Sequence, residues 1–564
     1  MRISSPFPMR IYRYRDKGDD FYLGTTLAGP LEVSDDRPWY AKPCDLAIDG
    51  QELAAFVKAL KPLKPWGISL SYCRRIKNAD LACLRELDEL KAVGLATTKL
   101  TAEALFYLKT LRELRYLSTD MMPLDDAGFA DLAELTTLET LRVRACKATS
   151  KGYAALAKLK ALKHLSIRDT ALADGDLGVL KSLPALTKLR LGGTKISSAA
   201  GTAIAEAKKL EHLELDGTAV DDKLLPALAA LSSLKFLNLP QTKVTGATIG
   251  ALREIRGLEL LNLNGAPVGD AAMKAVAELP ALNALLVPGT QVGDAGVSAL
   301  ASAPKLASID LSNTKTTDAG ITALAEVKTL KRLRLNRTRV KGAFVAKCAA
   351  DAIDLLHVDH TGFDDAAVKA MAGWKQIDDL SLAHTKVTSA EALCKLTSLV
   401  KLSLTATAVD DASLTGLPAL AKKLQVLHLA KTRVTDKSAG AIAKLATLID
   451  LRLEGTAFSD AGLAELKALK EMRSLRISET KITKKGLAVL KDLPKLGVLR
   501  VVSLGLGDAD LALFKGLPHL RELHLTGNPV TKAAVDAAKH LDLVHEVVVS
   551  ARRPRKELSK HPRL

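Results

Sequence analysis

Arginine and histidine recur at one position of a repeated segment, and this placement is the clearest chemical signal in the sequence. The segment has the form Leu-X-Leu, and X changes from one copy to the next. Because alternate residues of a strand face the same side, the X residues are predicted to share one face of a sheet. Three basic groups on that face are the candidate binding residues: Arg142, Arg144, Arg168 and Arg190; then Arg332, Arg334 and Arg337; then His428, Arg452, Arg476, Arg500 and His524.

The third basic group is the one that best suits an acidic protein surface. Its members fall on successive repeats, which predicts a ladder about 19 Å long across adjacent strands. Arginine binds carboxylates in a bidentate manner and is enriched at interface hot spots. The alternative is a solvated face that is neutralised by its own neighbours, Asp450, Glu454, Glu479 and Glu522. The first group is likewise interrupted by Glu214 and Asp216.

A second constellation could hold a metal ion. His357, Asp359 and His360 lie in the segment HVDH, and Asp379 and His384 follow one repeat later. Imidazole and carboxylate groups are ligands for zinc and other divalent metals. A metal-dependent site around His357 and His384 is therefore an alternative function. A plain polar patch is the preferred interpretation, because histidine often serves as a hydrogen-bonding surface residue. We therefore predict no metal or other cofactor.

Signatures of catalysis and of nucleic-acid binding are weak. The sequence lacks the GxxxxGK, HExxH and GxSxG motifs, which favours a protein that is not an enzyme. The net charge of +18 would suit phosphate contacts, but aromatic residues make up only 4% of the chain. Stacking platforms for single strands are therefore scarce, and nucleic acid is a disfavoured partner.

These side chains need a repeated element to position them. Leucine starts a 24-residue unit at positions 90, 114, 138 and so on to 330 without a change of step, after which the spacing varies. In the unit from Leu306 to Thr329, a period-2 strand with Leu306, Ile309 and Leu311 precedes helical spacing at Ile321 and Leu324. Neither half buries its apolar face alone, so the units must stack into a solenoid.

Two polar positions recur in each unit. Threonine follows the strand, as at Thr194, Thr314 and Thr456, and its hydroxyl is predicted to bond the backbone of the turn. Aspartate stands just before the helical segment, as at Asp294 and Asp460, which predicts helix N-caps. Both series are therefore predicted to be structural.

The pattern LxxLxLxxTxVTDAGLxxLxxL, as in VGDAGVSALA and FSDAGLAELK, resembles bacterial leucine-rich repeat proteins of the ribonuclease-inhibitor-like type. This resemblance implies an α/β leucine-rich repeat solenoid, a right-handed horseshoe or arc with a parallel concave sheet and convex helices. It also implies a protein that binds other proteins. We therefore expect a non-enzymatic protein-interaction scaffold. A secreted or injected bacterial effector that acts on a host protein is the alternative.

The sequence predicts three segments. Residues 1–45 are aromatic-rich and form a β-rich N-terminal cap with a hairpin from Met9 to Thr26; residues 46–541 form about twenty repeats; residues 542–564 hold a cap strand and a basic tail. The six cysteines are scattered, no secretory signal is evident, and no apolar run is long enough to span a membrane. These features predict a cytoplasmic protein and leave its oligomeric state open.

Overall fold

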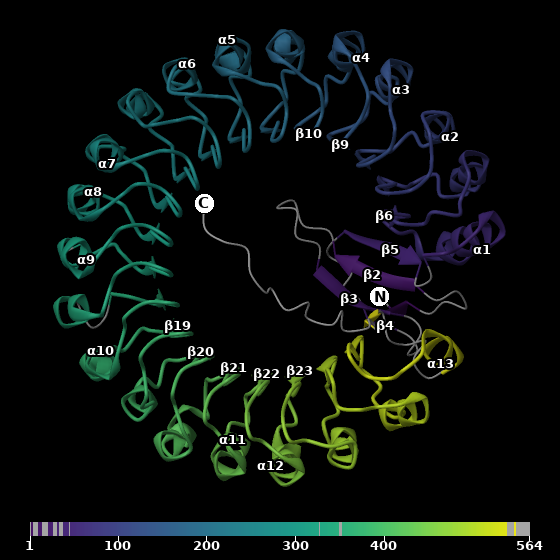
Figure 1. Ribbon diagram of the computed structural model, residues 1–564. Helices are drawn as coiled ribbons and strands as arrows, with labels where there is room; N and C mark the ends of the chain where they lie inside the picture. Colours follow the sequence, from purple (N-terminus) through teal and green to yellow (C-terminus); the bar gives the residue numbers. More distant parts are fainter. Residues whose placement is uncertain are drawn as a thin grey trace, which may run out of the picture. The chain divides into compact units, whose positions relative to one another are not determined.

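The computed structural model describes residues 2–3, 9–13, 21–25, 31–32, 38–43, 46–325, 327–348, 352–538 and 546–548. The chain divides into two compact units, Met1–Leu330 and Lys331–Leu564. The division falls where the uniform 24-residue spacing ends, at Leu330. In each unit, strands line the inner side and helices line the outer side (Figure 1). The predicted α/β leucine-rich repeat solenoid is therefore confirmed.

A parallel sheet forms the inner side of the N-terminal unit. Each strand pairs with the next one a repeat away, so that Leu165 lies beside Leu141 and Leu189. The strands are β5 (Trp39–Pro43), β6 (Gly67–Ser69), β7 (Ala92–Gly94), β8 (Tyr116–Ser118), β9 (Thr140–Arg144), β10 (His164–Arg168), β11 (Lys188–Arg190), β12 (His212–Glu214), β13 (Phe236–Asn238), β14 (Leu260–Asn262), β15 (Ala284–Leu286) and β16 (Ser308–Asp310).

The predicted N-terminal hairpin is present. Strand β2 (Met9–Arg13) pairs antiparallel with both β3 (Phe21–Thr25) and β5, and β5 continues in parallel into β6. Met9 and Ile11 are fully buried, so β2 contributes to the core. Strands β1 (Arg2–Ile3) and β4 (Leu31–Glu32) form a separate antiparallel pair.

The C-terminal unit repeats the parallel pattern. Its strands are β17 (Arg332–Arg334), β18 (Leu355–His357), β19 (Asp379–Ser381), β20 (Lys401–Ser403), β21 (Val426–His428), β22 (Asp450–Arg452), β23 (Ser474–Arg476), β24 (Val498–Arg500), β25 (Glu522–His524) and β26 (Glu546–Val548). Strand β26 extends the sheet within the segment predicted as a C-terminal cap. The predicted basic tail, residues 551–564, lies outside the described residues.

The outer elements are short. The α-helices are α1 (Gly50–Leu60), α2 (Ala104–Leu108), α3 (Asp126–Leu132), α4 (Ser150–Ala155), α5 (Gly201–Ala205), α6 (Leu224–Leu228), α7 (Asp270–Ala277), α8 (Asp294–Ala299) and α9 (Asp318–Leu324) in the first unit, and α10 (Asp365–Ala370), α11 (Ala439–Ala443), α12 (Asp460–Glu465) and α13 (Lys532–Ala537) in the second. Several repeats have a 3₁₀ segment in the same place, such as η5 (Asp174–Ser182) and η16 (Gly486–Asp492). Among the described residues, no helix has the length and apolarity needed to cross a membrane.

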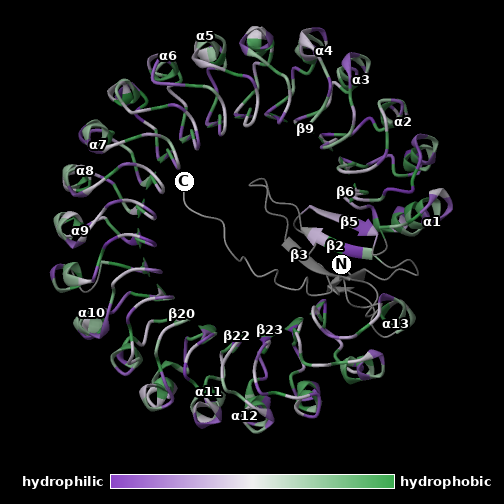
Figure 2. Cartoon of the chain, in the orientation of Figure 1, coloured by the Kyte–Doolittle hydropathy of each residue, from purple (hydrophilic) through white to green (hydrophobic). Residues whose placement is uncertain are grey.

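The core lies between the strands and the outer elements. The strand leucines and isoleucines of successive repeats, such as Leu285, Ile309 and Leu333, are almost completely buried. Hydrophobic and hydrophilic residues alternate within each repeat (Figure 2), because successive side chains of a strand point in turn to the core and to the surface. The concave side chains therefore stand on a sheet whose opposite face is fully packed.

The recurring threonines close the turn that follows each strand. The hydroxyl of Thr194 donates to the carbonyl of Leu191 at 2.6 Å, and Thr456 bonds Leu453 at 2.7 Å. Both side chains are buried, and the bond stays within one turn. The predicted structural role is confirmed for these residues.

The recurring aspartates have a different role from the predicted N-cap. The capping residue is the one before, as in α12, where Ser459 accepts from the amide of Ala461. Asp460 instead accepts from the backbone amide of Thr483 at 2.7 Å and from its hydroxyl at 2.6 Å, one repeat later. The same contact links Asp294 to Thr317. The N-cap prediction was wrong for these residues: Asp294 and Asp460 each tie their own repeat to the next one.

This contact also explains the glycine of the DAG motif. A Cβ atom on Gly320 would lie 2.6 Å from an Asp294 carboxylate oxygen and 2.9 Å from the Asp294 Cα. Because the Cα belongs to the backbone, that crowding has no simple relief. Glycine is therefore required to admit the carboxylate of the preceding repeat.

The aspartate contacts predict acid sensitivity. Burial would raise the pKa of Asp365, but hydrogen bonds from the Thr388 hydroxyl and from the amides of Ser389 and Thr388 outweigh it and lower the pKa. A carboxyl group whose pKa is lowered by folding stabilises the fold above its unfolded pKa, and this contribution disappears as the pH falls through the folded pKa. We expect the free energy of unfolding to decrease below about pH 4.

Urea unfolding across this pH range measures the effect. The Asp365→Ala variant should lose about 1–2 kcal/mol at neutral pH, because the Thr388 and Ser389 amides lose their acceptor, and should show a weaker decrease in acid. An unchanged pH profile in the variant would contradict the assignment.

Candidate functional site

The third basic group forms the predicted ladder on the strand face of the C-terminal unit. His428 pairs in register with Arg452, Arg452 with Arg476, Arg476 with Arg500, and Arg500 with His524. All five side chains are half-buried. We call these five residues the arginine ladder. The strand register alone positions them, since each stands at the central outward position of its repeat.

Carboxylates neutralise the ends of the arginine ladder. Asp450 lies 3.4 Å from the His428 imidazole and 3.8 Å from the Arg452 guanidinium. Glu522 lies 3.7 Å from His524. Burial would raise the pKa of Asp450, but the hydrogen bond from His428 and the nearby positive charges outweigh it and lower the pKa. The predicted neutralisation is therefore real at these positions.

The middle of the arginine ladder is different. Among the described residues, no carboxylate oxygen lies within 4.0 Å of the guanidinium nitrogens of Arg476 or Arg500. The buried Nε atoms of Arg452 and Arg476 have no hydrogen-bond partner there. Burial and then the charges of Arg476 and Arg500 lower the pKa of Arg452, although Asp450 and Glu454 act in the opposite direction. The guanidinium groups of Arg476 and Arg500 therefore stand without an ion-pair partner among the described residues.

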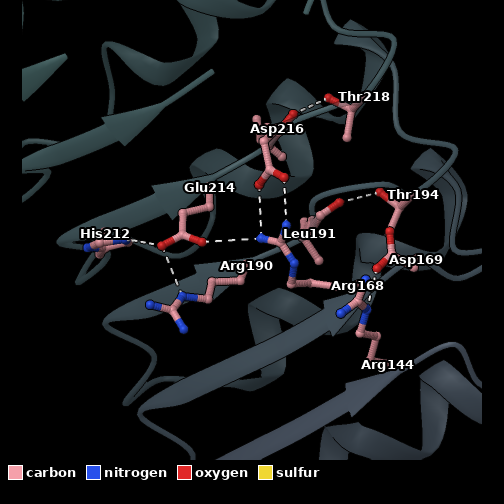
Figure 3. Close-up of polar contacts among 11 residues, drawn as sticks. Arg144, Arg168, Asp169, Arg190, Leu191, Thr194, His212, Glu214, Asp216 and Thr218 are labelled. Atoms are coloured by element: carbon pink, nitrogen blue, oxygen red, sulfur yellow. Dashed lines mark hydrogen bonds and ion pairs between the residues drawn. The ribbon is translucent and has the colours of Figure 1, made fainter. Parts of the chain in front are cut away.

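The first basic group is, in contrast, neutralised by its own surroundings (Figure 3). Arg168 makes two contacts with Asp216, at 2.9 and 2.6 Å, and one with Glu214 at 3.4 Å. Glu214 also accepts from Arg190 at 2.9 Å and lies 2.6 Å from His212. Burial would raise the pKa of Glu214, but His212 and Arg190 outweigh it and lower the pKa. Glu214 and Asp216, predicted to interrupt this group, in fact bind it.

The other two arginines of the first group are also paired. Arg142 lies 3.1 Å from Asp120, and Arg144 bonds Asp169. Both nevertheless stand on the strand face, with side chains that are 41% and 55% exposed. These pairs leave less charge available to a partner than the arginine ladder does, because exposed pairs are already partly satisfied.

The second basic group is spread along one repeat. Arg332 lies 3.5 Å from Asp354, and Arg334 pairs in register with His357. Arg337 has a left-handed backbone, with φ at +57°, and so lies in the turn after the strand. Strand register therefore joins Arg334, but not Arg337, to the central column of the concave face.

The histidines of the alternative metal site do not converge. His357 faces Asp379 at 2.9 Å, whereas His360 stacks on His384 with ring centroids 4.0 Å apart. His360 and His384 have left-handed backbones, with φ near +58° and +57°, which places them in the turns and away from the strand. No group of three or more metal-binding side chains occurs in the described ranges. The alternative metal site therefore does not form there.

Sequence reasoning missed two features. Asn528 stands where other repeats carry threonine, and its amide donates to the carbonyls of Val501 and Leu525. Asn528 therefore bonds the turn of its own repeat and also the preceding repeat, which has Leu504 in the threonine position. The other missed feature is a hollow in the N-terminal unit, lined in part by Tyr40 and Trp66. Tyr40 lies in the cap, outside the repeat column from which the candidates came.

Comparisons with known proteins agree with this architecture. A family model described as a leucine-rich repeat matches residues 516–537, a segment that includes Asn528. No curated protein matches the chain.

Solved structures are similar in fold. A complex of TLR13 with ssRNA13 is 17% identical, with a TM-score of 0.50, over 86% of this chain and 84% of that one. An internalin from Listeria monocytogenes is 22% identical, with a TM-score of 0.46, over 57% of this chain and 88% of that one. A plant peptide hormone receptor, RGFR1 in complex with RGF2, is 13% identical, with a TM-score of 0.38, over 86% of this chain and 89% of that one. Identities this low support a leucine-rich repeat fold and nothing finer.

Proposed function

We propose that this leucine-rich repeat protein is a non-enzymatic scaffold that binds an acidic segment of a protein partner along the arginine ladder. One observation carries the proposal: Arg452, Arg476 and Arg500 stand on adjacent strands, and the last two have no carboxylate partner among the described residues. Stacked like charges are unfavourable, so a bound anion would gain from relieving them. Guanidinium groups also bind carboxylates in a bidentate geometry.

The dimensions and surroundings suit a peptide chain more than a nucleic acid. Five strands about 4.8 Å apart span about 19 Å, which is the length of about six extended residues. The neighbouring outward positions on these strands hold no aromatic side chain on which a base could stack: Val426, Asp450, Ser474, Val498 and Glu522.

A reducing compartment fits this proposal, and we place the protein in the cytoplasm. No disulfide joins the described cysteines, which are Cys73, Cys83, Cys146, Cys348 and Cys394. Burial raises the pKa of the Cys83, Cys348 and Cys394 thiols to about 11, which keeps them protonated and unreactive.

Charge reversal tests the proposed function. In the triple variant Arg452→Glu, Arg476→Glu and Arg500→Glu, partners captured by the wild-type protein should be lost or strongly depleted at low salt. The reason is that the reversed row repels the acidic segment, which slows association and weakens the complex. Affinity capture followed by quantitative mass spectrometry measures the change.

A matched control lies on the outer side of the same repeats. Lys444, Lys467 and Lys491 are exposed and are replaced by Glu to give the same change in charge. This control should retain the partners, and both variants should keep the wild-type circular dichroism spectrum. The proposal fails if the ladder variant captures the wild-type set of partners, or if the two triple variants lose them equally.

A further inference from the structure

A second surface, in the N-terminal unit, has a different chemistry from the arginine ladder. A cavity of about 410 Å³ opens on the strand face over β6, β7 and β8. Its floor is made of small residues, including Ser69, Ala92 and Gly94. We call it the N-terminal hollow. Its volume lies at the lower end of the range for ligand pockets, which is about 300–1,000 Å³.

Strand register explains why the hollow exists. Tyr40 pairs with Gly67, Gly67 with Ala92, and Ala92 with Tyr116, so two tyrosines are separated by two small residues. Three strand spacings place the two tyrosine backbones about 14 Å apart. In the next outward column, Ser69 and Gly94 are also small. The space between the tyrosines is therefore left open for a group the size of an aromatic ring.

Aromatic and apolar groups form the walls of the hollow. Tyr40 lies at one side and Tyr116 at the other, and Trp66 also lines the hollow. Tyr72 and Met121 are also lining residues and are 53% and 52% exposed, which is unusual for large apolar side chains in this chain. Tyrosine and tryptophan supply large contact areas and favour offset or edge-to-face contacts with another ring. These walls therefore favour an aromatic occupant.

Three arginines border the hollow on the side of β9 and β10. Arg142, Arg144 and Arg168 line it; each pairs with a carboxylate, and of these carboxylates Asp120 lines the hollow whereas Asp169 and Asp216 lie outside its lining. Arg142 touches Asp120 at 3.1 Å through one terminal nitrogen, but its buried Nε has no partner among the described residues. The Arg142 and Arg144 side chains are 41% and 55% exposed, so a carboxylate next to an aromatic occupant would meet guanidinium donors on this side.

We propose that the N-terminal hollow is a recognition pocket for an aromatic side chain flanked by acidic residues, presented by a peptide segment of a protein partner. The aromatic ring would lie over Gly94 between the tyrosines, and the acidic neighbours would lie toward Arg142. A peptide fits better than a free small molecule because the arginine side of the hollow continues along the strand face. The carboxylate of a flanking peptide residue would contact the arginines there. The inference rests on the proposed function only in taking a protein segment as the occupant.

Short labelled peptides test this pocket in the full-length protein. The probe is a fluorescein-labelled peptide with the core Asp-Phe-Asp, and the comparison peptides carry Asp-Ala-Asp and Lys-Phe-Lys. Fluorescence anisotropy should show the Asp-Phe-Asp peptide binding at least tenfold more tightly than either comparison, since both the ring and the acidic flanks are recognised. Equal affinity for the Phe and Ala peptides, or no binding at roughly millimolar peptide, would overturn the proposal.

Substitutions in the pocket supply the second half of the test. Gly94→Leu fills the floor, and the nearest atoms to its Cβ are the hydroxyl oxygens of Ser69 and Ser71, at 3.2 and 3.3 Å, and the Ser69 Cβ, at 3.5 Å. Its matched control is Gly250→Leu, where a Cβ has open space. The pocket variant should bind the Asp-Phe-Asp peptide at least tenfold more weakly than the control. Full binding by a folded Gly94→Leu protein would overturn the assignment.

Two further variants separate the acidic flanks and the two sites. Arg142→Gln should weaken binding of Asp-Phe-Asp about fivefold without weakening Lys-Phe-Lys, whereas Arg112→Gln, at an exposed position, should change neither. The triple Glu variant of the arginine ladder should still bind the peptide, so failure of one site is distinguishable from failure of the other. If free phenylacetate competes as well as the peptide does, the hollow is a small-molecule pocket and the peptide proposal is wrong.

Discussion

Deletion of residues 234–257 should leave a folded but shorter N-terminal unit, whereas deletion of residues 234–245 should abolish its packing. The first deletion joins residue 233 to Leu258, which is buried as Leu234 is. Strand β12 then meets β14 in the register it has with β13, and Leu261 replaces Leu237 beside Leu213. The twelve-residue deletion instead brings outer residues to strand positions, so that the apolar faces no longer coincide.

The losses in the longer deletion are small and identifiable. The ion pair between Lys235 and Glu211 is exposed and contributes little. Asp222 loses the hydroxyl of Thr245 but still meets a backbone amide, because Gly269 takes the place of Thr245. Far-ultraviolet circular dichroism and thermal unfolding compare the two deletions. Equal loss of helical signal in both would contradict the repeat assignment.

The second large effect is expected from the core residue Leu311. Its side chain is completely buried at the end of β16, in the layer that each repeat shares with its neighbours. Leu311→Ala should lower the free energy of unfolding by about 2–5 kcal/mol, from lost transfer energy and from the cavity left behind. Urea unfolding measures this loss. The exposed Lys305→Ala, at the end of the preceding repeat, should change it by less than about 0.5 kcal/mol. A loss for Leu311→Ala no larger than the control's would show that the layer repacks freely.

The fold could be predicted because its signal is periodic. Leu306, Ile309 and Leu311 fix the strand and its buried face, and the same spacing in the next unit fixes the pairing partner. The threonine bonds were predictable for the same reason, since Thr314 bonds Leu311 three residues before it. The role of Asp294 was not predictable in this way, because its partner Thr317 lies one repeat away. The N-cap preference of aspartate considers only the neighbouring helix, which Asp294 itself begins.

The sequence was enough to locate the candidate site, but it could not show how the charges of the site are balanced. The column of Arg452, Arg476 and Arg500 follows from the repeat register, and these three residues pair in that register in the structure. Charge balance depends on side-chain reach: Glu214 and Asp216 extend to Arg168 two repeats away, while Arg476 and Arg500 meet no such carboxylate among the described residues. The N-terminal hollow depends on the pairing of Tyr40 with Gly67, which joins the cap to the repeats.

Direct titration of the arginine ladder tests the central claim most sharply. Fluorescein-labelled hexaglutamate, about 20 Å long when extended, should bind the wild-type protein at low salt and weaken as salt is added. Arg476→Gln combined with Arg500→Gln should lower the affinity at least tenfold, whereas Lys467→Gln combined with Lys491→Gln on the outer side should not. If the ladder variant and the outer-side control bind hexaglutamate with the same affinity, the positive charge of the whole protein accounts for binding, and the arginine ladder is not the site.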